Sequence, residues 1–236
     1  MGKRTKTQFL EVKYMKYTKF EINKFKGIDR LELDLVKYPN GKIFPLVGLN
    51  ESGKTTVLEA VDFFQKDFVE NKRHELIHKR DKGNFTGDIE TIATLELEKE
   101  DQPTIEEFLE QNSLRPENEI QKIILSKKYN YADGNSSSLT ITSAKFEPML
   151  RVKTTGARNY SNLEESLVEQ LASILQKRFP KILYFPDFLF DFPEKIYLET
   201  VPNPTWSEKE QIRQKEYREI LQDILCTINP LYKLET

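Results

Sequence analysis

Eight consecutive residues in the first quarter of the chain have the types and spacing of a loop that holds phosphate groups. Residues 48–55 read Gly-Leu-Asn-Glu-Ser-Gly-Lys-Thr, which fits the pattern G-x-x-x-x-G-K-S/T at every fixed position. Glycines let a backbone curl so that successive N–H groups point at phosphate oxygens. The N-terminus of a following helix adds further donors and a partial positive charge. The pattern therefore predicts a nucleotide-binding loop.

Different side chains of this loop are expected to contact the phosphates and the metal ion. Lys54 is expected to reach the β- and γ-phosphates as the catalytic cation, and the Thr55 hydroxyl is expected to ligate Mg²⁺. ATP and Mg²⁺ are thus the predicted cofactors. The predicted nucleotide contacts within the loop are Gly48, Asn50, Glu51, Ser52, Gly53, Lys54, Thr55 and Thr56.

The flanking segments predict the elements that hold the loop. Before it, residues 42–47 form a short apolar run, which is typical of a buried strand. After it, Val57, Val61 and Phe64 recur at helical spacing, which predicts a helix that runs to about residue 80. A strand, a glycine loop and a helix in this order form the context in which the pattern binds phosphate.

The rest of the chain alternates between strand-like and helix-like segments. Residues 17–36 predict two strands joined at Gly27, and a turn follows at 38–41. Further strands are expected at 89–98, 122–131, 139–146 and 181–185, with a polar loop at 132–138 and helices at 104–112, 163–179 and 207–227. We expect one lobe in three parts: 1–90 with the loop and the N-terminal hairpin, 91–150 as an antiparallel β-subdomain, and 151–236 as a helical segment with a return strand.

The overall charge predicts no particular partner, but its distribution is uneven. The 236 residues include 36 basic and 38 acidic side chains, which nearly cancel. Residues 1–30 carry nine Lys or Arg against three Asp or Glu. Two interpretations remain open for this stretch: a solvated, basic edge strand behind an unstructured leader, or a local contact with phosphate or DNA.

Cysteine content and hydropathy indicate the cellular compartment of the protein. Cys226 is the single cysteine, so no internal disulfide can form and a reducing compartment is favoured. The longest apolar run, 182–190, has about half the length that a membrane helix needs. The basic N-terminus is not followed by an apolar stretch, which argues against a secretory signal. We expect a soluble, cytoplasmic protein without a membrane partner.

Residues 17–64 carry a resemblance to a known family. The segments Ile-Asn-Lys-Phe-Lys-Gly-Ile at 22–28, Leu-Glu-Leu-Asp-Leu at 31–35 and the loop with its following helix at 46–61 resemble the N-terminus of RecF-like and SMC-like ATPases. Asn50 and the Leu-Glu-Ala run at 58–60 are most similar to the overcoming-lysogenization-defect (OLD) family of AAA-type ATPases, many of which serve in bacterial antiphage defence. The resemblance implies an α/β, P-loop NTPase fold: the first lobe of an ABC-type ATPase head, with an antiparallel β-subdomain and flanking helices.

The resemblance also implies a site residue, a function and partners. Lys26 matches a family cation near the nucleotide, although here Lys24 separates Asn23 from the following Phe25. Such heads hydrolyse ATP as dimers or hetero-oligomers and couple it to DNA transactions or antiphage defence. DNA is therefore a further candidate partner.

The family's second lobe has no counterpart in this sequence. That lobe supplies a Ser-Gly signature, a Walker B strand ending in Asp-Glu, and a switch His. Residues 182–187 resemble a Walker B strand, but Pro186 precedes Asp187 and Phe188 stands in place of the Glu. We therefore expect an ATP-binding lobe that hydrolyses ATP only when a second lobe or a partner completes it, as part of a longer or split protein.

Three other interpretations compete with this one. A regulatory module could sense ATP and bind a partner protein without hydrolysis. A phosphotransferase could use the same loop, but the chain has no Arg-rich lid and begins with a hairpin instead of the loop strand.

The segment 74–78, His-Glu-Leu-Ile-His, matches the zinc-protease pattern H-E-x-x-H. A zinc site needs a third ligand, these are the only two histidines, and basic pairs flank them, so a solvated helix end is expected.

Overall fold

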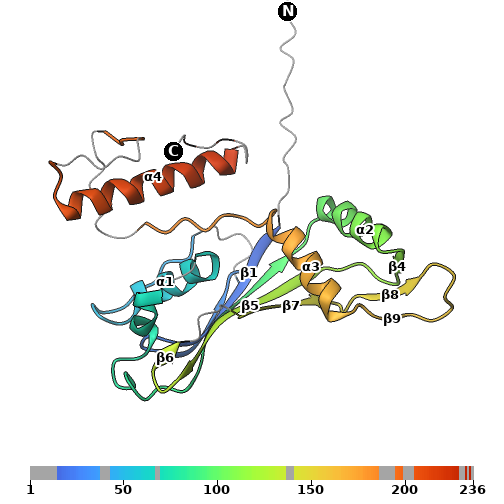
Figure 1. Ribbon diagram of the computed structural model, residues 1–236, viewed down its shortest axis with the longest axis horizontal. Coiled ribbons are helices and arrows are strands. Elements are labelled where there is room, and N and C mark those ends of the chain that lie inside the picture. Colours follow the sequence, from blue (N-terminus) through green and yellow to red (C-terminus); the bar gives the residue numbers. More distant parts are fainter. Residues whose placement is uncertain are drawn as a thin grey trace, which may run out of the picture. The chain divides into compact units, whose positions relative to one another are not determined.

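The computed structural model describes most of the chain as two compact units. The described residues are 15–37, 43–66, 70–136, 141–185, 195–198, 205–228, 232 and 234. The first unit is Met1–Pro180 and the second is Lys181–Thr236 (Figure 1). The predicted turn at 38–41, the basic residues before position 15, Asp187, and the end of the predicted 132–138 loop lie outside the described residues.

A six-stranded antiparallel sheet dominates the first unit, as the alternating segments predict. Its strands are β1 (Lys16–Phe25), β2 (Ile28–Asp34), β3 (Gly87–Glu96), β5 (Lys122–Ala132), β6 (Asn135–Ser136) and β7 (Ile141–Glu147). The order is β2-β1-β3-β5-β6, and β7 also pairs with β5. All these pairings are antiparallel. The predicted antiparallel sheet within a mixed α/β unit is thus confirmed.

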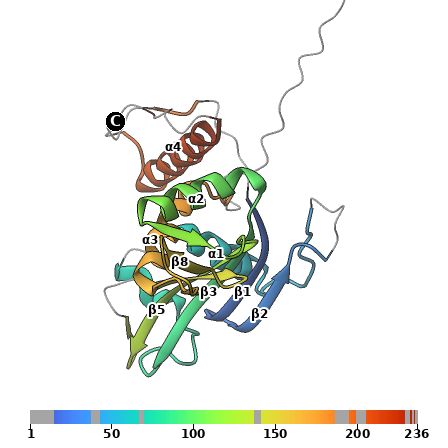
Figure 2. The same cartoon turned by 90° about the vertical axis from the view of Figure 1, so that its right-hand side faces the viewer.

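One face of this sheet is buried and the other is polar. Phe20 and Ile22 of β1 alternate with Glu21 and Asn23, so that the apolar side chains enter the core and the polar ones face away. Figures 1 and 2 show α1 (Lys54–Gln65), α2 (Gln102–Gln111) and α3 (Glu165–Gln176) on the same side of the sheet. The helices therefore cover the apolar face.

Aromatic packing fixes α1 against the sheet. The Phe63 ring is fully buried, with its centroid 5.7 Å from that of Phe25 and 5.3 Å from that of Tyr129. The Thr91 hydroxyl donates a hydrogen bond of 3.2 Å to the Ala60 carbonyl. Burying one large apolar side chain contributes about 1.5–3 kcal/mol. This cluster holds the body of α1, and through it the loop that precedes the helix.

A second, smaller sheet was not predicted. It consists of β4 (Leu114–Pro116), β8 (Arg151–Thr154) and β9 (Ser161–Asn162), in the order β4-β8-β9. Val152 is buried beneath it, while Arg151 faces outward. Strands this short lack the alternating run that marks a strand in a sequence.

The second unit contains one long helix, α4 (Glu208–Ile228), close to the predicted 207–227. The Tyr197 and Trp206 ring centroids lie 4.8 Å apart, and the Tyr197 backbone N–H donates to the Gln214 side-chain oxygen at 3.4 Å. These contacts join the short described segment 195–198 to the helix. No helix in the described parts of either unit is both long and apolar enough to cross a membrane.

Two predicted strands are wrong. Residues 43–49 and 181–185 have no regular secondary structure. Ile43 is 84% exposed and Val47 is 92% exposed. An apolar run forms a stable strand only when neighbouring strands satisfy its backbone and bury its side chains. Neither segment pairs with a strand of the two described sheets.

The predicted helix from the loop to about residue 80 is also wrong. Helix α1 ends at Gln65, and Lys66 is extended. A 3₁₀ helix, η1, follows at Glu70–Leu76. Leu76, at the end of η1, and Ile77, directly after it, are both buried. The chain between α1 and these two residues is therefore not one continuous α-helix.

Candidate functional site

The loop at 48–53 turns tightly and ends at the first residue of α1. Gly53 is the N-cap and has a φ of 89°, in the left-handed region that glycine adopts without strain. Glu51 is also left-handed, with a φ of 64°. The Ser52 N–H donates to the Leu49 carbonyl at 3.2 Å. A Cβ on Gly48 would lie 2.6 Å from the Ser52 Oγ, so any other residue at position 48 would require the Ser52 hydroxyl to rotate away.

The Lys54 side chain folds back over the loop. Its Nζ donates to the carbonyl oxygens of Gly48 at 2.9 Å and Leu49 at 2.7 Å, and lies 3.4 Å from the Ser52 Oγ. The ammonium group is therefore held against the backbone of the loop. Phosphate oxygens would compete with these two carbonyls for the same donor.

The N-terminus of α1 is accessible to a ligand. No side chain caps it, and its first turn carries no acidic residue. The Val57 N–H bonds the Gly53 carbonyl at 3.0 Å and closes the first turn, while Thr55 on that turn is exposed. The earlier backbone N–H groups of a helix have no intrahelical acceptor and attract anions.

The hydrogen-bond donors of the loop suit the phosphates of ATP, and one hydroxyl suits magnesium. The loop and helix N–H groups with the Lys54 ammonium form a set of donors suited to a polyphosphate. The Thr55 hydroxyl is an oxygen ligand of the kind that Mg²⁺ uses together with phosphate oxygens. A bound magnesium ion would neutralise part of the negative charge of the phosphates. Asn50, Glu51 and Thr56 belong to the same continuous stretch.

The structure brings Lys26 to α1 through a contact that the sequence did not reveal. The Lys26 Nζ donates to the Glu59 Oε2 at 2.6 Å, and both side chains are about three-quarters buried, being 27% and 29% exposed. The Lys26 backbone N–H also donates to the Leu76 carbonyl at 2.6 Å. Glu59 follows Thr55 by one helical turn on the same face. Lys26 is therefore held beside the first turns of the helix that begins at the loop.

Glu59 is the residue that sequence reasoning missed. The available signal was its spacing: on a helix that starts at Lys54, Glu59 shares a face with Thr55. Its partner Lys26 is 33 residues away in the chain, so the ion pair itself became visible only with the fold.

The described residues do not assemble the parts of a second ATPase lobe. Ile182 and Phe185, in the segment resembling a Walker B strand, belong to an irregular stretch. Within the described parts of the chain, no group of three or more His, Cys, Asp or Glu side chains is placed to hold a metal ion.

The two histidines of the zinc-protease pattern do not share a helical face. His74 lies in η1, which ends at Leu76, whereas His78 follows the helix. The His78 Nδ1 accepts a hydrogen bond of 3.1 Å from the Arg80 backbone N–H. A 3₁₀ helix has three residues per turn, so positions four apart diverge even within it. The α-helix that the zinc interpretation requires is not formed.

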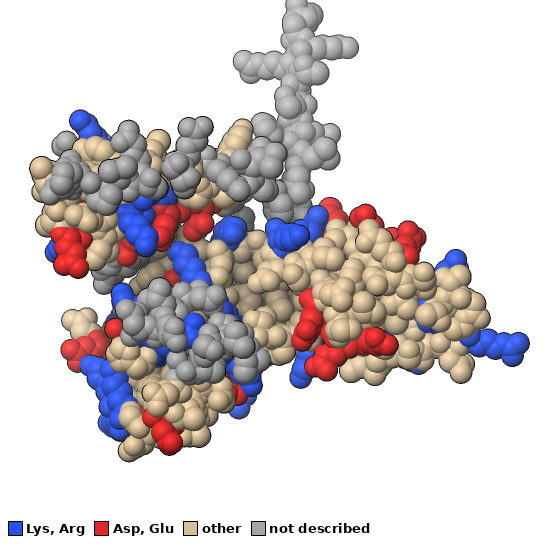
Figure 3. All heavy atoms as spheres, in the orientation of Figure 1, with Lys and Arg blue, Asp and Glu red and all other residues tan. Residues whose placement is uncertain are grey.

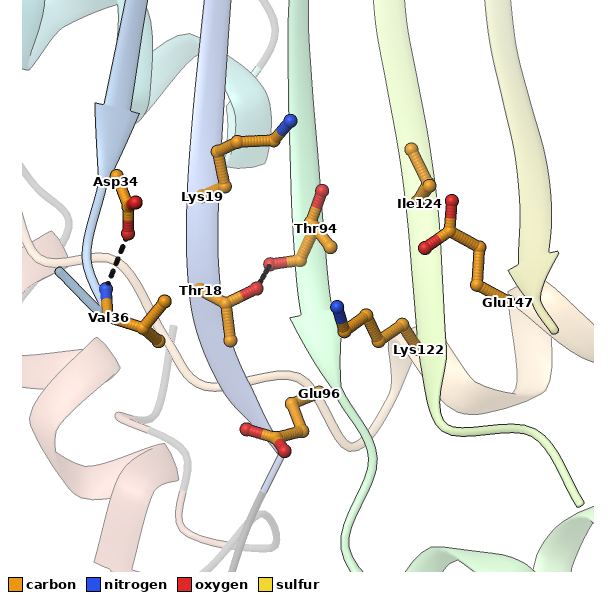
Figure 4. A pocket seen from close by; sticks show the side chains of 9 residues that line it. All are labelled: Thr18, Lys19, Asp34, Val36, Thr94, Glu96, Lys122, Ile124 and Glu147. Carbon is orange, nitrogen blue, oxygen red and sulfur yellow. Dashed lines mark hydrogen bonds between the residues drawn. The ribbon is translucent and has the colours of Figure 1, made fainter. Parts of the chain in front are cut away.

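A separate hollow of about 470 Å³ opens on the polar face of the large sheet (Figure 4). Lys122 lies between Glu96 and Glu147 in the strand register. The hydrogen bond to Glu21 at 2.7 Å raises the pKa of Lys19. The Asp34 carboxylate accepts the backbone N–H of Val36 at 2.9 Å. These charges face opposite charges or backbone donors, so the hollow is a self-neutralised surface and not a binding site for a charged ligand.

Comparison with known proteins finds structural similarity only, to several solved structures. No protein-family model and no curated protein matches the chain. One solved structure comes from a study of the structural biochemistry of ATP-driven dimerization and DNA-stimulated activation of SMC ATPases. It has 15% sequence identity and a TM-score of 0.38, and the alignment covers 88% of this chain and 98% of that one. The case for function therefore stays with the residues of this chain.

Proposed function

We propose that this chain binds ATP with Mg²⁺ at residues 48–56, as the nucleotide-binding lobe of an ATPase head. The observation that carries the proposal is the Lys54 ammonium held over the loop, 2.9 Å from the Gly48 carbonyl and 2.7 Å from that of Leu49. Together with left-handed Gly53 and the open helix N-terminus, it places a cation and backbone donors around one small volume.

Each residue of the loop has a distinct role in this proposal. Gly48 and Gly53 permit the backbone path, and the N–H groups from Asn50 to Thr56 surround the phosphates. Lys54 exchanges its two carbonyl partners for β- and γ-phosphate oxygens. Thr55 ligates the magnesium ion. Lys26, held nearby through its ion pair with Glu59, is the second cation of the proposed site.

Hydrolysis in this proposal depends on a second lobe supplied by a partner or by another part of a longer protein. Two features of residues 43–49 support this. The segment is apolar, and it is exposed without regular structure, with Val47 92% and Leu49 85% exposed. A neighbouring strand would satisfy its backbone and bury these side chains.

The family resemblance sets the wider role. On residues 17–64 we place the chain among RecF- and SMC-like ATPases, nearest to the OLD branch, acting in the cytoplasm in DNA transactions or antiphage defence. In this role the heads associate as a homodimer or hetero-oligomer, and DNA is the further partner. The competing function is a regulatory module that senses ATP and binds a partner protein without hydrolysis.

Replacing Lys54 tests the nucleotide site. Lys54→Ala should weaken binding of a fluorescent ATP analogue about tenfold or more, because a charge-assisted contact to phosphate is worth about 1.5–3 kcal/mol. Lys66→Ala is the matched control, since it removes a lysine just beyond the other end of α1. Unchanged affinity in Lys54→Ala, or an equal loss in Lys66→Ala, would overturn the assignment.

A further inference from the structure

The outer face of the small sheet carries an unusual row of side chains. In the β4–β8 register Arg115 lies directly opposite Lys153, and Arg151 on the same outer face pairs with Asn162 of β9. The Lys153 Nζ lies 4.7 Å from the centroid of the Tyr160 ring, which directly precedes β9. Across the three strands, the row therefore reads Arg115, Lys153, Tyr160.

Arg115 and Lys153 bring like charges together. Residues directly opposite each other in an antiparallel pair have Cβ atoms about 5 Å apart, and like charges at such positions are destabilising. The neighbouring row is different, because the Arg151 guanidinium pairs with the Glu117 carboxylate at 2.6 Å. The sheet thus neutralises one cation and keeps two others side by side. An anion bound between the two cations would be attracted to both and would offset their mutual repulsion.

The frame that presents these cations is held by hydrogen bonds. The Arg151 guanidinium donates to the Tyr160 carbonyl at 3.3 Å, which ties β8 to the start of β9. The Thr155 N–H donates to the Ser113 carbonyl at 3.1 Å, which ties the end of β8 to the residue before β4. The turn between β8 and β9 adds exposed Arg158. Figures 1 and 3 show Lys and Arg atoms at the end of the first unit where β8 and β9 lie.

We propose that this face, defined by Arg115, Lys153, Arg158 and Tyr160, binds the phosphate backbone of a nucleic acid. Two adjacent cations with a third on the turn match the close spacing of backbone phosphates, and an aromatic ring beside them suits a sugar or base. The surrounding outer-face residues Thr155, Asn159 and Asn162 are polar and exposed. They can bond phosphate and sugar, whereas an amphipathic membrane-binding surface would carry Trp, Phe or Leu beside its cations. This inference deepens the DNA part of the proposed function by locating the contact.

The test measures binding of a fluorescein-labelled 25-base-pair DNA duplex, and of its single strand, to the full chain without nucleotide. The triple variant Arg115→Gln, Lys153→Gln, Arg158→Gln should weaken binding about tenfold or more near 0.1 M salt. On the duplex, the slope of log K against log[salt] should become shallower by roughly 2–3, because each lost phosphate contact removes about 0.9.

A charge-matched control separates this face from general electrostatics. Lys79→Gln, Arg80→Gln, Lys82→Gln removes three exposed cations from the turns after η1. This control variant should keep most of the DNA affinity and most of the salt dependence of binding. Glu117→Gln frees Arg151 from its ion pair and should tighten binding severalfold, a gain that misfolding does not produce.

Several results would overturn the proposal. These are an equal loss in the control triple variant, no gain in Glu117→Gln, or equal competition by polyglutamate or by anionic phosphatidylglycerol vesicles. Because nucleotide is left out, a failed ATP titration would not alter this result, and failure here would not alter the ATP site.

Discussion

At the scale of single residues, Gly53 and Gly83 form a matched pair for separating backbone strain from phosphate binding. Gly53 has a φ of 89° and Gly83 a φ of 95°, and a Cβ on either would meet no atom within 4 Å. Replacing either with Ala should therefore cost about 1–2 kcal/mol of folding free energy through left-handed strain alone. Only Gly53→Ala should also weaken ATP binding, because position 53 sets the N-terminus of α1.

Thermal unfolding and fluorescent-nucleotide titration of both glycine variants check this prediction. We expect comparable losses of Tm and a loss of affinity confined to Gly53→Ala. If both variants bind ATP like the parent chain, the loop does not position the phosphates. If both lose affinity equally, the effect is one of stability alone.

The identities of the loop residues were predictable because the pattern is local. Gly48, Gly53 and Lys54 are recognised by spacing within eight residues, and the helix that follows is visible in its periodicity. The Lys54 contacts with two carbonyls and the close approach of Gly48 to Ser52 depend on backbone dihedral angles, which the pattern does not specify. The Lys26–Glu59 pair depends on how β1 and β2 meet α1, which is a property of the fold.

At the scale of elements, the junction between the β1–β2 turn and α1 can be tested through Lys26. Lys26→Ala should reduce ATP affinity severalfold if this cation serves the phosphates. Glu59→Gln should raise affinity severalfold, because it removes the carboxylate that holds the ammonium 2.6 Å away. Lys24→Ala is the matched control: Lys24 lies two residues earlier and is engaged by Asp29 at 2.8 Å.

Isothermal titration with ATP and Mg²⁺ measures all three variants. The Lys26–Glu59 pair is about three-quarters buried, and losing it should cost on the order of 1 kcal/mol of stability. None of the three variants should therefore unfold. Equal affinities in Lys26→Ala and Lys24→Ala would contradict a role for Lys26 at the nucleotide.

The success of strand prediction depended on whether a strand is half buried. β1, β3 and β5 alternate clearly, because one face meets the helices and the other meets solvent. On the polar face Asp88 accepts hydrogen bonds from Lys128 and Asn130, which hold the pKa of its carboxyl below the ordinary value. Continuous apolar runs gave a weaker signal, since 43–47 has the composition of a buried strand but lacks a described neighbour to pair with.

At the scale of the whole molecule, nucleotide binding and turnover should separate. In the proposed function the loop, Lys54 and Thr55 bind ATP and magnesium, and all of them lie within the first unit. Hydrolysis also needs a residue that orients or activates the attacking water. In residues 182–188, the segment that resembles a Walker B strand, Phe188 follows Asp187 in place of the Glu that would do this. The exposed apolar segment 43–49 also supports dependence on a second lobe, because a neighbouring strand would bury its side chains.

We therefore predict that the isolated chain binds ATP but hydrolyses it far more slowly than the roughly 1–100 s⁻¹ typical of phosphoryl-transfer enzymes. Phosphate release with Mg²⁺ measures this rate, and Lys54→Ala reports any contaminating ATPase. If two copies complete each other's sites, the rate per chain should rise with protein concentration. If a different polypeptide supplies the second lobe, the rate should stay flat until that partner is added. Rapid, concentration-independent turnover that is lost in Lys54→Ala would show that this chain already contains the activating residue.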